Sequence, residues 1–183
     1  GMGAYTPLPW LPAEAVSAIV EDVVKPVAAE LVRRGCGFTG LLYAGLAMTS
    51  AGPAVVEFNC RFGDPETQPL LTRLETPLFE VLHAAATGGL GGHAPLAWGS
   101  GAAVGVVVAA HGYPDSPRRG DPITGADQDG VFHAGTALDA DGRLVSAGGR
   151  VLTVVGTGDT LAAARDAAYA TVARIGLPGG FSR

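Results

Sequence analysis

One short stretch of the chain combines a clear structural pattern with an unusual set of functional groups. It reads VVEFNCRFGDPETQ and covers residues 55–68. Residues 55–62 alternate between apolar and polar side chains, which predicts a strand whose successive side chains point to opposite faces. One face of this strand would carry Glu57, Asn59 and Arg61.

These three side chains suit a site for a metal ion and a phosphate. Glu57 and Asn59 would start from Cα atoms roughly 7 Å apart, so that both oxygens can reach one hard cation. Mg²⁺ prefers such ligands and completes its shell with water and substrate phosphates. The guanidinium of Arg61 matches the geometry of a phosphate or a carboxylate. The competing interpretation is structural, because exposed strand faces often carry such polar residues without a task.

The residues that follow predict a sharp turn into a helix. Gly63 is expected to end the strand, Asp64 to cap the helix, Pro65 to occupy its first position and Glu66 to lie in its first turn. The same Asp-Pro-Glu pattern is also common at the start of helices that carry no functional site. The functional interpretation gathers five side chains where the strand meets the helix: Glu57, Asn59, Arg61, Asp64 and Glu66.

Composition argues against several classes of function. The 183 residues carry 12 basic and 17 acidic side chains and no basic run, so binding to duplex nucleic acid is not expected. The only lysine is Lys25, which excludes a carrier lysine elsewhere and a GxxxxGK[ST] loop. Cys36 and Cys60 are too few for a zinc ribbon or a disulfide scaffold, and both are predicted to be reduced and buried. Without a membrane span or a secretion signal, the chain is predicted to be cytoplasmic.

The elements before the central stretch are predicted to position it. An apolar stripe at helical spacing predicts a helix over residues 12–34, bent at Pro26 and ended by Gly35. Residues 38–49 form a strand candidate that pairs antiparallel with the 55–62 strand. This pairing would place residues 43–45 opposite Glu57.

The remainder of the chain is predicted to be α+β. Helix is expected from Glu66 to about residue 88 with a break at Thr76-Pro77, and the glycine-rich residues 87–101 are interpreted as a linker between two domains, 1–98 and 99–183. The second domain is predicted as an antiparallel sheet covered by a last helix that Asp159 or Thr160 caps. Its predicted strands cover residues 102–111, 131–138, 144–147 and 150–155.

Taken together, these stretches resemble the glycinamide ribonucleotide synthetase (phosphoribosylamine-glycine ligase) family of ATP-grasp enzymes. The likeness lies in GMGAYTPLP at residues 1–9, GLLYAGLAMT at 40–49, VVEFNCRFGDPETQPLL at 55–71, HGYPDSPRRGDPITG at 111–125, VFHAGT at 131–136 and GGRVLTVVGTGDTLAAARDAAY at 148–169. The resemblance implies the second half of an ATP-grasp domain, followed by a small hybrid-motif-like lobe of antiparallel sheet and covering helix.

The resemblance also implies a reaction and roles for the candidate residues. The family joins glycine to 5-phosphoribosylamine through a glycyl phosphate, with ATP as co-substrate. By position, Glu57 and Asn59 would hold Mg²⁺, or Mn²⁺, between the ATP phosphates, in agreement with the predicted strand face. Arg61 would bind the acyl phosphate or the ribose phosphate. Asp64 and Glu66 would orient the amine or support Arg61.

The chain departs from the family pattern in two ways. Many ATP-grasp relatives carry a further acidic metal ligand where this chain has Tyr43-Ala44-Gly45, so a second Mg²⁺ would lack that ligand. The chain also starts about halfway through the family's ATP-grasp domain. It is therefore predicted to be a carboxyl-terminal fragment, inactive alone, whose missing amino-terminal lobe is supplied in cis or in trans, or whose exposed apolar surface a homodimer covers.

Three alternatives remain beside this interpretation. The chain could belong to another ATP-grasp carboxylate-amine ligase or a carboxylase subunit, which would need a bicarbonate site or a biotin-linked partner. It could also be a non-catalytic binding module of the hybrid-motif kind, or a folded but inert structural remnant. The absence of any lysine after Lys25 argues against a biotinyl or lipoyl carrier.

Overall fold

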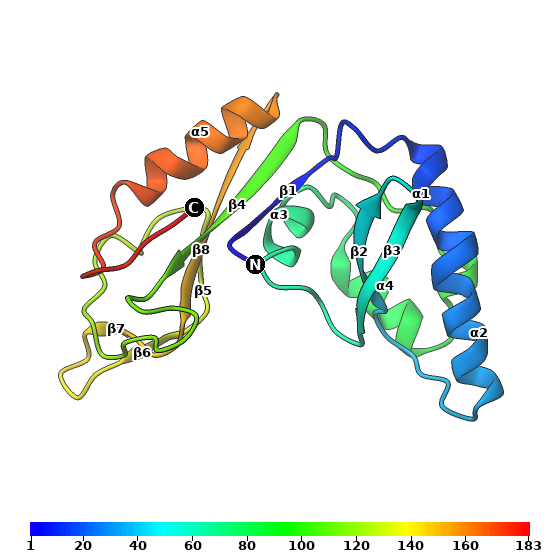
Figure 1. Ribbon diagram of the computed structural model, residues 1–183, viewed down its shortest axis with the longest axis horizontal. Coiled ribbons are helices and arrows are strands. Elements are labelled where there is room, and N and C mark those ends of the chain that lie inside the picture. The colour runs from blue at the N-terminus through cyan, green and yellow to red at the C-terminus, as the bar shows by residue number, and fades with distance from the viewer. The chain divides into compact units, whose positions relative to one another are not determined.

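Small and β-branched side chains make β4 (Ala102–Ala109) the central strand of the largest sheet, and all but one of its residues are buried. It pairs antiparallel with β1 (Gly3–Thr6) on one side and with β8 (Arg150–Gly158) on the other. β5 (Val131–His133) extends the sheet beyond β8, which gives the order β1-β4-β8-β5. The computed structural model describes all residues 1–183 (Figure 1).

Glycines on the two central strands allow helices to approach both faces of this sheet. On one face, α5 (Leu161–Val172) packs against β4 and β8, and Ala164 and Ala168 are fully buried there beside Gly156. On the other face, Pro69 of α3 (Thr67–Thr72) lies over Gly105. Thr160 caps α5, as predicted, because its Oγ1 accepts a hydrogen bond from the third residue of the helix. The predicted antiparallel sheet with a covering helix is confirmed.

The predicted strand over residues 131–138 is instead two short strands, β5 and β6 (Thr136–Leu138), and β6 forms a hairpin with β7 (Leu144–Ser146). The break lies at Gly135, whose backbone is so close to Gly148 that a Cβ atom would stand 2.7 Å from the Gly148 Cα atom. This close crossing turns the chain out of the large sheet. The predicted turn before Gly142 is confirmed, with the Gly142 N–H donating to the carbonyl of Asp139.

The chain crosses several times between two compact units. The sheet unit consists of Gly1–Pro7, Asp64–Leu74 and Trp98–Arg183, and it contains β1, β4–β8, α3 and α5. The hairpin unit consists of Leu8–Gly63 and Glu75–Ala97. The sequence did not predict that β1 would pair with the sheet of the carboxyl-terminal region, or that α3 would pack against it. The division into domains 1–98 and 99–183 stays a prediction.

The hairpin unit begins with the predicted helix, which is continuous through α1 (Ala13–Ile19), a π-helical turn (Val20–Val24) and α2 (Lys25–Arg33). The π turn ends two residues before Pro26 and widens the helix where the proline ring would crowd the preceding turn. Gly35 follows with φ +72°, the left-handed conformation predicted for the helix end. The other helices of the unit are α4 (Leu78–Ala86) and a 3₁₀ turn (Leu90–Gly92).

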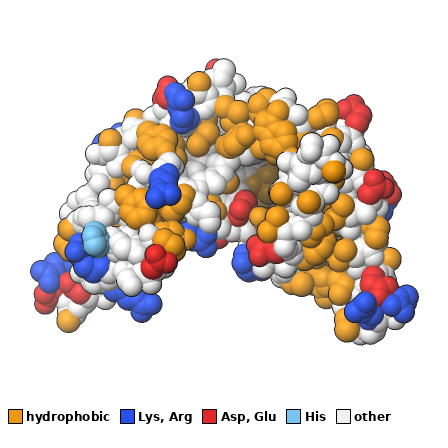
Figure 2. Space-filling view, in the orientation of Figure 1, with side chains coloured by type: hydrophobic (Ala, Val, Ile, Leu, Met, Phe, Trp, Pro, Cys, Tyr) orange, Lys and Arg blue, Asp and Glu red, His pale blue; other side chains and the backbone are white.

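Strands β2 (Tyr43–Thr49) and β3 (Gly52–Asn59) form the two-stranded antiparallel sheet of the same unit. None of the unit's hydrophobic residues is fully buried, and Val56 and Phe79 remain 71% and 76% exposed. Figure 2 shows hydrophobic side chains on this surface. Cys36 and Cys60 are free thiols and both are exposed, so the prediction that they are buried is wrong. Cys36 lies beyond the end of α2 and Cys60 beyond the end of β3, so neither belongs to the packed face of an element. No helix of the chain is long and apolar enough to span a bilayer.

Candidate functional site

The β2–β3 hairpin brings the candidate metal ligands together. Its register pairs Tyr43 with Asn59 and Gly45 with Glu57. This confirms the prediction that residues 43–45 lie opposite the Glu57 region. Beyond Gly45 the register shifts, because Leu46 pairs with Val55 and Val56 is left as the extra residue of a β-bulge. The bulge lies immediately before Glu57 and turns the strand at the first candidate ligand.

Glu57 and Asn59 lie on one face of β3. Residues that pair directly in an antiparallel ladder share a face, so Glu57 stands over Gly45 and Asn59 beside Tyr43. A Cβ atom on Gly45 would lie 3.2 Å from Glu57 Cγ and 3.3 Å from Tyr43 Cε1. An alanine here would require Glu57 or Tyr43 to shift by a few tenths of an ångström, and a larger side chain would displace them further. Glu57 is exposed and Asn59 half-buried, so neither side chain turns into an apolar interior.

This pair fits part of a magnesium site. It offers one carboxylate and one amide oxygen, which are ligands that Mg²⁺ accepts, and the ion would take its remaining ligands from phosphates and water. The chain contains no cluster of three or more His, Cys, Asp or Glu side chains that would enclose a metal by itself. The donor set therefore suits an ion that arrives with a phosphorylated substrate.

Arg61 does not continue the strand face, contrary to the prediction. β3 ends at Asn59, because its partner strand begins at Tyr43 and offers no residue to pair with positions 60–62. The exposed Arg61 lies in the bend that follows, where its Nη1 donates to the carbonyl oxygen of Phe62 at 2.9 Å. Its remaining guanidinium N–H groups have the geometry to bind an anion.

Asp64 and Glu66 lie in a turn that precedes α3. The prediction that Asp64 caps the helix and Pro65 begins it is wrong: the Asp64–Pro65 peptide is cis, Glu66 is the N-cap and the helix starts at Thr67. The first helical hydrogen bond runs from Leu70 N to the carbonyl of Glu66 at 3.2 Å. The turn thus takes the place of the predicted first helical turn.

Arg150 contacts this turn and was not predicted as a site residue. Its Nη1 donates to the carbonyl oxygen of Asp64 at 2.9 Å, and its Nη2 lies 3.9 Å from Asp64 Oδ1. The sequence marked only a tight reversal before Arg150, at Gly148-Gly149. Since 86 positions separate the two partners, no local pattern could have revealed the contact.

The five predicted residues are divided between the two units. Glu57, Asn59 and Arg61 belong to the hairpin unit, whereas Asp64 and Glu66 belong to the sheet unit. The boundary follows Gly63 and is crossed by the covalent chain. That all five act at one site stays a prediction.

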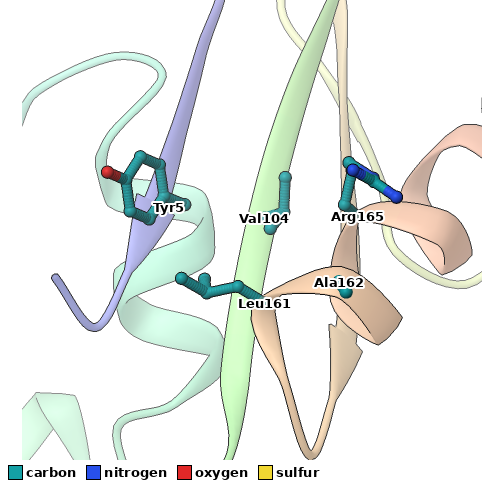
Figure 3. A pocket seen from close by; sticks show the side chains of 5 residues that line it. All are labelled: Tyr5, Val104, Leu161, Ala162 and Arg165. Carbon is teal, nitrogen blue, oxygen red and sulfur yellow. The ribbon is translucent and has the colours of Figure 1, made fainter. Parts of the chain in front are cut away.

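A separate pocket opens on the sheet unit beside the start of α5. Its lining is mainly apolar, with Arg165 as the one charged group (Figure 3). None of the five predicted residues lines it, and it holds no acid–base pair. Its walls are Tyr5, Val104, Leu161, Ala162 and Arg165.

Two family models match the chain. Residues 1–67 match the ATP-grasp (A) domain of phosphoribosylglycinamide synthetase, and residues 103–183 match the C domain of the same enzyme. The first match includes Glu57, Asn59, Arg61, Asp64 and Glu66, and the second includes Arg150 and the large strands β4 and β8.

Curated and solved relatives extend this similarity over the whole chain. The phosphoribosylamine–glycine ligase of Mycobacterium tuberculosis is 60% identical over 183 residues, which are 100% of this chain and 43% of the relative. The crystal structure of the Thermotoga maritima phosphoribosylamine–glycine ligase is 35% identical, with a TM-score of 0.88 over 100% of this chain and 45% of that chain. The chain thus spans less than half the length of these ligases.

A more distant structure shares the fold alone. The biotin carboxylase domain of the Hydrogenobacter thermophilus 2-oxoglutarate carboxylase, solved with MgADP, ADP and bicarbonate, has a TM-score of 0.68 at 12% identity. The match covers 99% of this chain and 40% of that chain. The predicted α+β architecture of an ATP-grasp protein is confirmed by the match to the ATP-grasp (A) domain and by the Thermotoga maritima structure.

Proposed function

Because the chain belongs to the phosphoribosylglycinamide synthetase family, we propose that it is the part of a phosphoribosylamine–glycine ligase that holds the metal-bound phosphates of ATP. The reaction would join glycine to 5-phosphoribosylamine through a glycyl phosphate. The observation that carries the proposal is the shared face of Glu57 and Asn59 opposite Gly45. It presents two oxygen ligands to a cation and leaves the rest of the coordination shell open to ATP.

In this proposal Glu57 and Asn59 bind Mg²⁺ or Mn²⁺ from the same side of β3. The metal, when bound, neutralises charge on the phosphoryl group that is transferred to the glycine carboxylate. The carboxylate of Glu57 contributes the negative charge and Asn59 a neutral oxygen, which together suit a divalent ion that also binds phosphates. Gly45 keeps the space beside Glu57 open, so that the carboxylate remains free to turn toward the ion.

The neighbouring residues are assigned to the other substrates. Arg61 has one guanidinium nitrogen tied to Phe62 and would use the others to bind the acyl phosphate or the ribose phosphate. Asp64 and Glu66 would orient the amine of 5-phosphoribosylamine for its attack on the glycyl carbonyl. Their carboxylates favour a cationic or hydrogen-bond-donating group such as an amine.

The hairpin unit requires a covering partner in the proposed enzyme. Its exposed apolar side chains include Val55, Val56 and Phe79. Exposed apolar surface of this kind is a common mark of an interaction site. The remaining part of a complete ligase, in cis or in trans, would cover this surface, and a second copy of the chain is the alternative occupant. The enzyme would act in the cytoplasm.

A chimeric ligase tests the proposal. In this protein the chain replaces the matching 43% of the Mycobacterium tuberculosis ligase, and the assay measures ADP release that depends on glycine and 5-phosphoribosylamine. Glu57→Gln should lower turnover by more than about 100-fold and raise the Mg²⁺ concentration needed for half-maximal rate. Glu80→Gln, an exposed position on α4, is the matched control and should leave both unchanged.

The outcomes separate the parts of the proposal. A folded chimera that releases no ADP in response to glycine would contradict the assigned reaction. Near-normal turnover of Glu57→Gln or Arg61→Ala would remove that residue from the site. The 183-residue chain alone is expected to show no glycine-dependent ADP release, and turnover above background would overturn its assignment as an incomplete enzyme.

A further inference from the structure

Arg150 links the sheet to the turn that contains two of the proposed substrate-binding residues. It is the first residue of β8, and its guanidinium reaches back to Asp64 with one nitrogen on the backbone carbonyl and another near the carboxylate. Both groups belong to the sheet unit. Its side chain is 31% exposed and that of Asp64 36% exposed, so water screens the contact only in part.

The backbone beneath Arg150 is held in place by close crossings that only glycines permit. The carbonyl of Arg150 accepts the N–H of Gly135 at 2.9 Å, and the carbonyl of Gly149 accepts the N–H of Ala110 at 2.8 Å. A Cβ atom on Gly149 would lie 2.4 Å from Cδ2 of the Tyr113 ring. The side chain of Arg150 therefore extends from a backbone that is fixed by hydrogen bonds and close packing.

One oxygen of the Asp64 carboxylate lies on the side of this arginine. Its Oδ1 atom is buried and has no hydrogen-bond partner, and the 3.9 Å distance to Arg150 Nη2 is too long for a hydrogen bond. That oxygen is therefore held by the charge of the guanidinium. The backbone hydrogen bond to the Asp64 carbonyl sets the position of the turn, and the charge sets the rotation of the side chain.

We propose that Arg150 is a positioning residue of the ligase reaction, which fixes the 64–66 turn so that Asp64 and Glu66 face the amine substrate. This inference rests on the proposed function and adds a residue for which neither the sequence pattern nor the metal ligands account. Arg150 acts through Asp64 and does not itself touch a substrate. The chain enters the sheet unit at Asp64, three residues after Arg61. The contact with Arg150 therefore also fixes this point of entry.

The chemistry of the side chain makes the proposal specific to arginine. A planar guanidinium can serve a carbonyl and a carboxylate at once from two nitrogens, whereas a lysine ammonium is a single point charge on a flexible stem. Lysine at this position would keep the attraction to Asp64 and lose the two-point geometry. A role in packing alone would depend on side-chain volume and would be satisfied by methionine.

The test uses Arg150→Met and Arg150→Lys in the chimeric ligase, with Arg165→Met as the matched control. Arg165 is an exposed arginine of the same unit, and its guanidinium pairs with the adjacent Asp166. Arg150→Met is expected to raise the KM for 5-phosphoribosylamine by roughly 30-fold to 100-fold, since a displacement of about 1 Å costs on that order. The KM for ATP should stay within about twofold of the unmodified chimera. Arg150→Lys should recover only part of the loss.

Each result decides for or against the proposal. Equal loss of kcat in Arg150→Met and Arg150→Lys, with every KM unchanged, would indicate a smaller folded fraction and overturn the positioning role. So would a KM for the amine that stays at the unmodified value. A KM for ATP that rises with that of the amine would assign Arg150 to the ATP site instead.

A second variant displaces the backbone that carries Arg150 and leaves the charge of its side chain unchanged. Gly149→Ala places a methyl group against the Tyr113 ring and should displace Arg150. It is expected to raise the KM for the amine in the same direction, and the double substitution Gly149→Ala, Tyr113→Ala should recover part of it. If the unmodified chimera turns over but neither Gly149→Ala nor Arg150→Met moves that KM, the positioning role fails while the ligase assignment stands.

Discussion

Gly156 offers a direct measure of how closely α5 is packed on the sheet. It lies on β8, eight positions before Ala164 on the covering helix, and its φ angle is not in the left-handed region. A Cβ atom built there would lie 2.3 Å from both the Ala164 oxygen and the Ala168 nitrogen. These are backbone atoms of a helix, which cannot rotate away as a flexible side chain would.

The cost of Gly156→Ala follows from these distances. Ordinary contact with a Cβ atom begins near 3.4 Å, so the helix must retreat by about 1 Å. A gap of that size removes about a quarter to a half of the dispersion energy of each contact across the interface. Ala164 and Ala168, now fully buried, would lose part of their packing. We expect a loss of about 3 kcal/mol in the free energy of unfolding.

Thermal unfolding of the full chain, followed by circular dichroism, measures this effect. For a unit of about 100 residues, 3 kcal/mol corresponds to a fall in Tm of roughly 12 to 24 °C. Gly142→Ala is the matched control: its φ of +77° makes alanine strained, but no atom lies within 4 Å of the added methyl. Strain alone costs about 1 kcal/mol. A Tm for Gly156→Ala at or above that of Gly142→Ala would refute the packing argument.

Three further substitutions test separate parts of the structure. Thr160→Ala removes the hydroxyl that caps α5 and should lower the stability of the chain by about 1 kcal/mol in urea unfolding, whereas Thr160→Ser should retain it. The backbone N–H and guanidinium of Arg143 lower the pKa of the Asp139 carboxyl, so the charged form stabilises the native state above the ordinary value near 3.8. The Tm difference between the native chain and Asp139→Asn should therefore be present at pH 6, shrink as the pH falls through the lowered native pKa and vanish in stronger acid. Gly45→Val should displace Glu57 and raise the Mg²⁺ requirement of the chimera more than about tenfold, with Gly45→Ala, which needs a shift of only a few tenths of an ångström, much closer to native.

Patterns within one element were predicted well from the sequence. The helix that ends at Gly35, the antiparallel β2–β3 pairing that places residues 43–45 opposite the Glu57 region and the Thr160 cap are each confirmed. Each depends on a local signal: apolar residues at helical spacing, alternation in a strand, or a hydroxyl before a helix. Because these signals lie within a few residues of the element they determine, the elements could be predicted without knowledge of the tertiary fold.

The wrong predictions arise where a partner in the fold overrides the local signal. Arg61 alternates correctly with Asn59, yet its segment leaves the strand because β2 has no residue left to pair with it. Asp64-Pro65-Glu66 has the residues of a helix start, yet the helix begins only at Thr67. Nothing in residues 3–6 indicated that they would pair with a strand a hundred positions later, because edge pairing depends on the register of β4.

The residues of the candidate site differ in the same way in how far the sequence alone could predict them. Glu57 and Asn59 lie on one strand, where a period of two fixes their common face, so the sequence was sufficient to predict them. Arg150 reaches Asp64 from the beginning of β8, across 86 positions of sequence, so the contact depends on the tertiary fold. The proposed site therefore combines two kinds of residue: proposed ligands that a local period reveals, and a proposed positioning residue that only the tertiary fold reveals. The KM of Arg150→Met for the amine is the measurement that distinguishes the proposed positioning role from ordinary packing.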